Sequence, residues 1–123
     1  MTIDTNIIIA YLEGDALIIE TLSQWQMEGK SLFLSTVAET EILSFPGFSP
    51  EEHGATILFL EENFTSFPFD RALARIAAQI RQSTRIKFPD AAIAATALIT
   101  NTPLVTRNVR DFQKIRGIRM VTV

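Results

Sequence analysis

Short apolar runs alternate along this chain with longer segments of helical period. Such runs are typical of strands, and their alternation with helices predicts an α/β fold with a mainly parallel sheet of four or five strands. The predicted strands are Thr2 to Thr5, Ser31 to Leu34, Ser66 to Phe69, Pro103 to Thr106 and Arg119 to Thr122. The predicted helices are Asn6 to Leu12, Ala16 to Met27, Thr36 to Phe45, Pro50 to Asn63, Asp70 to Ser83 and Asp90 to Thr100. At 123 residues, we expect one domain spanning residues 1–123.

Capping residues mark several of the predicted helix starts. Ser49 lies three residues before Glu52, as in a capping box. Thr36 begins another predicted helix, and Asp70 and Asp90 each stand immediately before an apolar helical run. These positions predict N-caps.

The composition argues against several classes of protein. The chain has no cysteine and a single histidine, His53, which argues against a zinc site and against Ser/His/Asp or Cys/His catalysis. No glycine motif for nucleotide phosphates is present. The long uncharged stretch between Asp90 and Arg107 is interrupted by threonine, asparagine and proline, so we expect no membrane span. Without cysteine or a leader-like N-terminal segment, we expect a cytoplasmic protein.

The charges divide the chain into an acidic and a basic part. Residues 1–70 contain twelve acids and one base, a formal charge of −11, whereas residues 71–123 contain ten bases and two acids, a formal charge of +8. Such asymmetry indicates a polyanionic partner such as nucleic acid. In the predicted helix from Asp70, the arginines project opposite the apolar side; these are Arg71, Arg75, Arg81 and Arg85. Solvation is the ordinary interpretation of such a face. Because Lys87 follows the four arginines, phosphate contact by this set is the functional interpretation.

Two acids of the acidic part occupy informative positions. Asp4 follows the first predicted strand, where the ligand crevice of an open α/β sheet lies, although an aspartate there also caps helices. Helical spacing puts Glu41 on the apolar side with Val37 and Ile42. Glu41 therefore either faces inward, where a carboxylate needs a partner or a metal, or lies at the edge of the apolar side and reaches solvent.

The two acids of the basic part also have local contexts of their own. Asp90 lies between Pro89 and a helix of small residues, where capping is the structural alternative. Asp111 follows the predicted strand that ends at Thr106, and its structural alternative is a surface acid paired with a neighbouring arginine. Four carboxylates at strand ends would repel one another unless a divalent cation neutralises them, and oxygen-only ligands suit Mg²⁺ or Mn²⁺.

Four segments in series resemble the PIN-domain family, and within it the VapC toxins of type II toxin–antitoxin modules. They are Asp4-Thr5-Asn6, Ser35 to Ile42, Pro89 to Ala97 and Thr106 to Phe112, and they span nearly the whole chain in the family's order and spacing. The resemblance implies a PIN-like three-layer α/β/α sandwich. It also implies a Mg²⁺- or Mn²⁺-dependent endoribonuclease that is usually dimeric and is silenced by a small VapB-like antitoxin.

The resemblance also assigns roles to individual residues. Asp4, Glu41 and Asp90 fall on the family's metal ligands, and Asp111 falls on its fourth acidic position, which Asn108 could share. Asn6, Thr106 and Asn108 fall on polar positions that support the site. The resulting hypothesis is hydrolysis of an RNA phosphodiester, with Arg107 and Arg110, the arginines nearest in sequence, binding flanking phosphates. A non-catalytic RNA- or partner-binding module and a metal-dependent phosphatase are the alternatives.

Apolar residues on two predicted helices are candidates for an antitoxin groove or a dimer contact, with core packing as the ordinary interpretation. They lie between Ala16 and Met27 and from Pro50 to just beyond Asn63, and they are Leu17, Ile18, Leu22, Trp25, Ile57, Leu58, Leu60 and Phe64.

Overall fold

Five short strands form one parallel sheet in the order β3-β2-β1-β4-β5. The computed structural model describes all of residues 1–123. The strands are β1 (Thr2–Ile3), β2 (Phe33–Ser35), β3 (Thr65–Phe67), β4 (Leu104–Val105) and β5 (Met120–Val121). Every neighbouring pair runs parallel, which confirms the predicted fold class. The strands are shorter than predicted but lie within one or two residues of the predicted positions.

Seven helices connect and follow the strands. They are α1 (Thr5–Leu12), α2 (Ala16–Met27), α3 (Thr36–Leu43), α4 (Pro50–Asn63), α5 (Arg71–Ser83), α6 (Phe88–Thr100) and α7 (Val109–Phe112). Six of them match predicted helices. The seventh, α7, was not predicted because four residues are too few to show a helical period.

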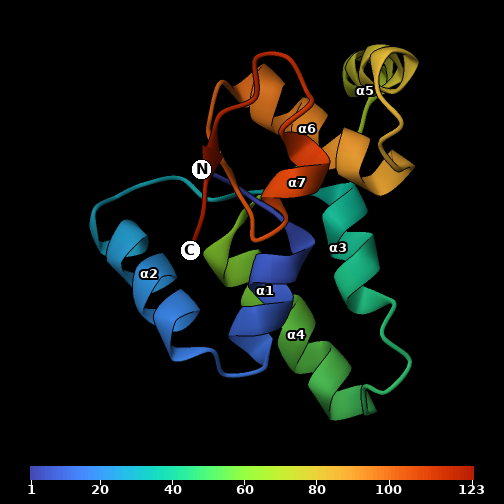
Figure 1. Ribbon diagram of the computed structural model, residues 1–123. Helices are drawn as coiled ribbons and strands as arrows, with labels where there is room; N and C mark the ends of the chain where they lie inside the picture. Colours follow the sequence, from blue (N-terminus) through green and yellow to red (C-terminus); the bar gives the residue numbers. More distant parts are fainter.

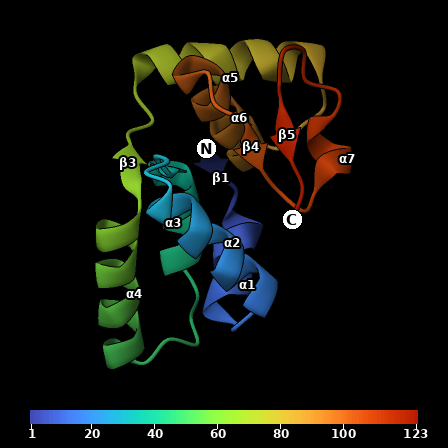
Figure 2. The same cartoon turned by 90° about the vertical axis from the view of Figure 1, so that its left-hand side faces the viewer.

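The strand order reverses direction at β1. β2 and β3 are added on one side of β1, whereas β4 and β5 are added on the other. Because parallel crossovers are right-handed, the helices of these two sets of connections cover opposite faces of the sheet, which gives three layers. Figures 1 and 2 show α5 and α6 toward one end of the molecule and α1, α2 and α4 toward the other.

The observed caps agree with two predictions and correct two others. Ser49 and Glu52 form the full capping box of α4, and Asp70 caps α5 by accepting a hydrogen bond from the backbone N–H of Leu73. Ser35, rather than Thr36, caps α3. Asp90 is not a cap, because α6 begins two residues earlier and Pro89 occupies its first turn, a position that proline favours.

The core forms around the buried strands and α6. Ile3, Leu34, Leu104 and Val105 are almost completely buried, and so is every residue of α6 from Ala91 to Ala97. The alanines of α6 allow close approach to neighbouring helices, α5 above all. None of the helices combines the length and the apolar character that spanning a membrane would require.

Candidate active site

The site lies between β1 and β4, where the strand order reverses. In an open parallel sheet, ligands bind at this point, beyond the carboxyl ends of the strands. Asp4 directly follows β1 and Thr106 directly follows β4, and the backbone N–H of Asp4 donates to the carbonyl oxygen of Val105 (3.0 Å). The sheet pairing therefore brings together two polar residues that are 102 positions apart in the sequence.

Asp4 is the most deeply buried of the four acids, with 4% of its surface exposed. Its Oδ1 accepts from the backbone N–H of Thr5 (2.7 Å), and its Oδ2 accepts from the hydroxyl of Thr106 (2.8 Å). Burial raises the pKa of Asp4, the two hydrogen bonds oppose that rise, and Glu41 and Asp111 add to it. Asp4 thus caps α1 and also lies beyond the end of β1, so it is both a helix cap and a candidate site residue.

Glu41 lies at the edge of the apolar side of α3 and reaches solvent. Its side chain is exposed, and its Oε1 accepts from the hydroxyl of Thr5 (2.8 Å). Of the two interpretations left open by the sequence, the solvent-reaching one is the observed one. Thr5 nevertheless connects Glu41 with Asp4, because its backbone N–H and its hydroxyl each bind one of the two carboxylates.

Asp90 is the acid with the most unusual surroundings. It lies in the first turn of α6, is half-buried, and neither caps the helix nor forms a side-chain hydrogen bond or ion pair within the chain. Burial, together with the charges of Asp4, Asp111 and Glu41, raises the pKa of Asp90 to about 6. Asp90 therefore lies near enough to the three other carboxylates to be affected by their charges.

Asp111 is exposed on α7 and is held by an amide rather than by an arginine. The Nδ2 of Asn108 donates to its Oδ2 (2.6 Å), and neither ion pair of the chain involves it. The hydroxyl of Thr106 accepts from the backbone N–H of Asn108 (2.9 Å) and, at 3.5 Å, from the Nδ2 of Asn6. Thr106 therefore connects the residues around Asp4 with those around Asp111.

These residues suit a hard divalent cation in their chemistry. Carboxylate oxygens, hydroxyls and amides are the ligands and supports that Mg²⁺ and Mn²⁺ take, and no cysteine is present to favour a softer metal. As the side chains stand, no three of the acids are close enough together to hold one ion. A cation held by three of these acids would therefore require at least one of the side chains to move.

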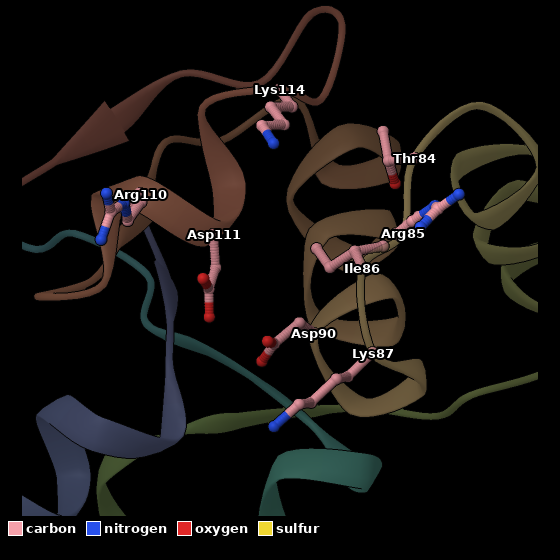
Figure 3. Close-up of a pocket in the computed structure, with 8 residues that line it drawn as sticks. All are labelled: Thr84, Arg85, Ile86, Lys87, Asp90, Arg110, Asp111 and Lys114. Carbon is pink, nitrogen blue, oxygen red and sulfur yellow. The ribbon is translucent and has the colours of Figure 1, made fainter.

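A pocket of about 280 Å³ opens beside Asp90 and Asp111. Figure 3 shows the two carboxylates directed into the space between α6 and α7, with Lys114 on one side and Lys87 on the other. The residues lining the pocket are Thr84, Arg85, Ile86, Lys87, Asp90, Arg110, Asp111 and Lys114.

The pocket includes one of the two arginines predicted to bind RNA. Arg110 lines it, whereas Arg107 points elsewhere. The Nη1 of Arg107 forms an ion pair with Asp15 (2.9 Å), and its Nε donates to the carbonyl oxygen of Val123 (3.0 Å). Arg107 thus ties the loop after β4 to α2 and to the last residue of the chain.

Sequence reasoning missed two residues at this site, Thr5 and Lys114. Thr5 was noted only as part of the first motif, and its hydrogen bond to Glu41 becomes visible only once α1 and α3 are placed together. Lys114 lines the pocket but was not singled out, whereas Arg85 and Lys87, which also line it, were among the candidates for phosphate contact.

A second, largely apolar pocket of about 440 Å³ lies between α1 and the end of α3. Its lining residues are Ile9, Leu12, Glu13, Glu41, Ile42, Ser44, Phe45 and Phe48, and we call it the apolar groove. The predicted groove on α2 and α4 is corrected in part, because Ile18, Leu22, Leu60 and Phe64 are buried in the core. Leu17 and Leu58 of that set are exposed.

Comparison with known proteins finds relatives along the whole chain. The PIN domain family model matches residues 1–118. Ribonuclease VapC1 of Rickettsia felis is 32% identical, with all of this chain and 96% of the relative aligned. Ribonuclease VapC of Rickettsia bellii is 29% identical over the same shares of both chains.

Solved structures give the same result for the fold. A chain of a toxin–antitoxin complex from Klebsiella pneumoniae is 26% identical and superposes with a TM-score of 0.82, covering 99% of this chain and 98% of that one. A chain of VapBC2 from Rickettsia felis, bound to a DNA fragment from the promoter, has a TM-score of 0.86 at 17% identity, covering 99% and 97%. The latter identity is low, so it supports the fold alone.

Proposed function

Because the chain belongs to the PIN-domain family, we propose that it is a metal-dependent endoribonuclease that acts as the toxin of a VapBC-type toxin–antitoxin pair. Residues 1–123 would form one nuclease domain acting in the cytoplasm, where its RNA substrate is found. The relatives named as VapC ribonucleases support the activity, and the toxin–antitoxin complex at 26% identity supports the partner.

The surroundings of Asp90 carry this proposal. A half-buried carboxylate that caps nothing, binds no donor and has a pKa near 6 has no evident structural role. Perturbed carboxyl groups of this kind cluster at functional sites. Its position with three other acids at the point of strand reversal is where an α/β protein binds its ligand.

Asp4, Glu41, Asp90 and Asp111 would hold Mg²⁺ or Mn²⁺. When bound, the cation would lower the pKa of a water molecule and neutralise charge on the phosphodiester. Thr5 and Thr106 fix the two oxygens of Asp4, so that this carboxylate presents one orientation. Asn108 holds Asp111 toward the pocket, and Asn6 supports Thr106 from the other side.

Cleavage of a mixed pool of structured RNAs would test this function. We expect bands with Mg²⁺ or Mn²⁺ that disappear in EDTA. Asp4→Asn and Asp90→Asn should each lower the rate at least about 100-fold, because several kcal/mol of charge stabilisation would be lost. Glu62→Gln, which neutralises an exposed carboxylate on α4, serves as the matched control. Full cleavage by both aspartate variants would refute the assignment, and RNA binding without cleavage would favour a non-catalytic module.

The apolar groove is the proposed binding site for the antitoxin. Its apolar side chains come with Glu13 and Glu41 at its edge, so it would suit an amphipathic segment that carries a basic side chain. Because Glu41 belongs to both the groove and the site, an occupant of the groove would reach the acids. We also propose that the toxin is a homodimer, which light scattering of the purified chain would check.

A further inference from the structure

Three of the ten cations in residues 71–123 hold backbone carbonyl groups. Arg81 donates to Ile86, Arg107 to Val123 and Arg119 to Asn101. These arginines therefore stabilise loops. Part of the positive charge of residues 71–123 therefore has a structural role. Only the remaining cations are free to bind an anionic ligand.

Four of these remaining cations line the pocket beside Asp90 and Asp111. They are Arg85, Lys87, Arg110 and Lys114, and we call them the pocket cations. None forms a hydrogen bond or an ion pair within the chain, although two carboxylates line the same pocket. Four positive charges outnumber the two acids of the pocket, so the pocket would attract an anion.

Both walls of the pocket are anchored. On one wall, Arg81 holds the carbonyl of Ile86, whose side chain is buried, and Thr84 donates its hydroxyl to Ile80 (2.8 Å). On the other wall, buried Phe112 and Ile115 fix α7 and the turn that follows it. Anchored walls lower the entropic cost of binding, because only the side chains need to order.

The lining also indicates which part of a nucleotide fits. It contains no aromatic ring, and Ile86 is its one apolar residue. Bases of single-stranded nucleic acid are held mainly by stacking on aromatic side chains, whereas phosphates are held by Arg and Lys. At about 280 Å³, the pocket is also smaller than most sites that enclose a drug-sized ligand.

We propose that the pocket cations form a subsite for a backbone phosphate of the RNA next to the one that is cleaved. This subsite rests on the proposed ribonuclease function. It holds the RNA on this side through phosphate charge, so the identity of the base there does not affect binding. Arg107 instead acts as a positioning residue for the loop that carries Thr106 and Asn108.

The test compares two double variants with the same change in charge. Arg85→Gln/Lys114→Gln removes one cation from each wall, whereas Arg71→Gln/Arg75→Gln removes two exposed cations of α5 that lie outside the pocket. Binding of a short labelled RNA is measured by fluorescence anisotropy in EDTA between about 50 and 200 mM salt. For single strands, each lost phosphate contact lowers the slope of log K against log salt by about 0.7.

We expect the pocket variant to lower this slope by about 0.7 to 1.4 and the α5 variant to leave it unchanged. RNAs that differ only in base sequence should lose the same factor in affinity. In metal-dependent cleavage, the pocket variant should raise KM more than it lowers kcat. Arg85→Lys, which keeps the charge, should retain the wild-type slope.

The results separate this proposal from the proposed function. A lowered slope in a protein that cleaves no RNA would keep the pocket cations as a binding site for an RNA phosphate and refute the ribonuclease. Normal cleavage with an unchanged slope and KM would overturn the subsite and keep the ribonuclease. An equal loss in the two double variants would also overturn it, since binding would then follow the total charge.

Discussion

Asp90 lowers the stability of the metal-free protein at neutral pH. Its pKa is about 6 in the folded chain, against an ordinary value of 3.8, so the folded state binds the proton more tightly. This group therefore destabilises the fold as pH rises from about 4 to 6, and the full penalty remains above that range. A site that holds mutually repelling carboxylates costs stability, which is common where function requires the charges.

Asp90→Asn should consequently stabilise the metal-free protein at about pH 7.5. We expect the free energy of unfolding to rise by roughly 1–2 kcal/mol after solvent screening is allowed for. The gain should shrink toward zero near pH 4, where the wild-type carboxyl is protonated as well. Thermal melts in EDTA at the two pH values measure the difference, with Glu62→Gln as the control. A gain that does not depend on pH would contradict this account.

The sequence could predict that the acids lie beyond the ends of strands, but it could not predict their hydrogen-bond partners. Asp4 and Asp111 lie just beyond strands, and parallel strand ends meet at one edge of a sheet. The hydrogen bonds between Thr5 and Glu41 and between Thr106 and Asp4 join residues 36 and 102 positions apart. No local pattern specifies such pairs. The exposed position of Glu41 likewise depends on how α3 packs, which its helical period left open.

At the scale of elements, α6 determines where Asp90 lies. Its residues from Ala91 to Ala97 are all buried, and α5 packs closely against it. Apolar runs, small residues and caps predicted most strands and helices within a few residues. The prediction that Asp90 starts α6 was wrong because two patterns compete there. Aspartate favours the cap and proline favours the first turn, and the chain follows the proline.

Ala94→Leu tests the importance of close packing along α6. The alanine is fully buried, so three extra carbons must displace neighbouring atoms. We expect a loss of about 1–3 kcal/mol in the free energy of unfolding. Ala78→Leu, at an exposed position of α5, makes the same chemical change and should stay within about 0.5 kcal/mol of wild type. Urea denaturation compares the two variants. Equal midpoints would show that the core around Ala94 can accommodate a larger side chain.

At the scale of the whole molecule, the acidic and basic parts of the chain meet at one site. Residues 1–70 supply Asp4, Glu41 and the apolar groove, whereas residues 71–123 supply Asp90, Asp111 and the pocket cations. The charge asymmetry of the sequence therefore corresponds to two different surfaces, the apolar groove and the pocket cations, which lie beside the same acids. One surface is basic and suits RNA, and the other is apolar with an acidic edge and suits a protein segment.

This division predicts that the two binding activities can be separated by mutation. Ile9→Glu and Phe45→Glu place a charge in the apolar groove, where the side chains are 42% and 59% exposed, so folding should be little affected. Each should weaken binding of the proposed antitoxin at least about tenfold, since an apolar contact is replaced by a charge beside Glu13 and Glu41.

Leu17→Glu is the matched control for these variants. Leu17 is 55% exposed on α2 and belongs to the groove predicted from the sequence, but it lies outside the groove found in the structure. Its substitution should leave antitoxin affinity unchanged, and all three variants should cleave RNA at the wild-type rate. Isothermal titration calorimetry with the purified antitoxin measures the affinities. If Leu17→Glu alone weakened binding, the antitoxin would bind on α2, and the apolar groove between α1 and α3 would need another occupant.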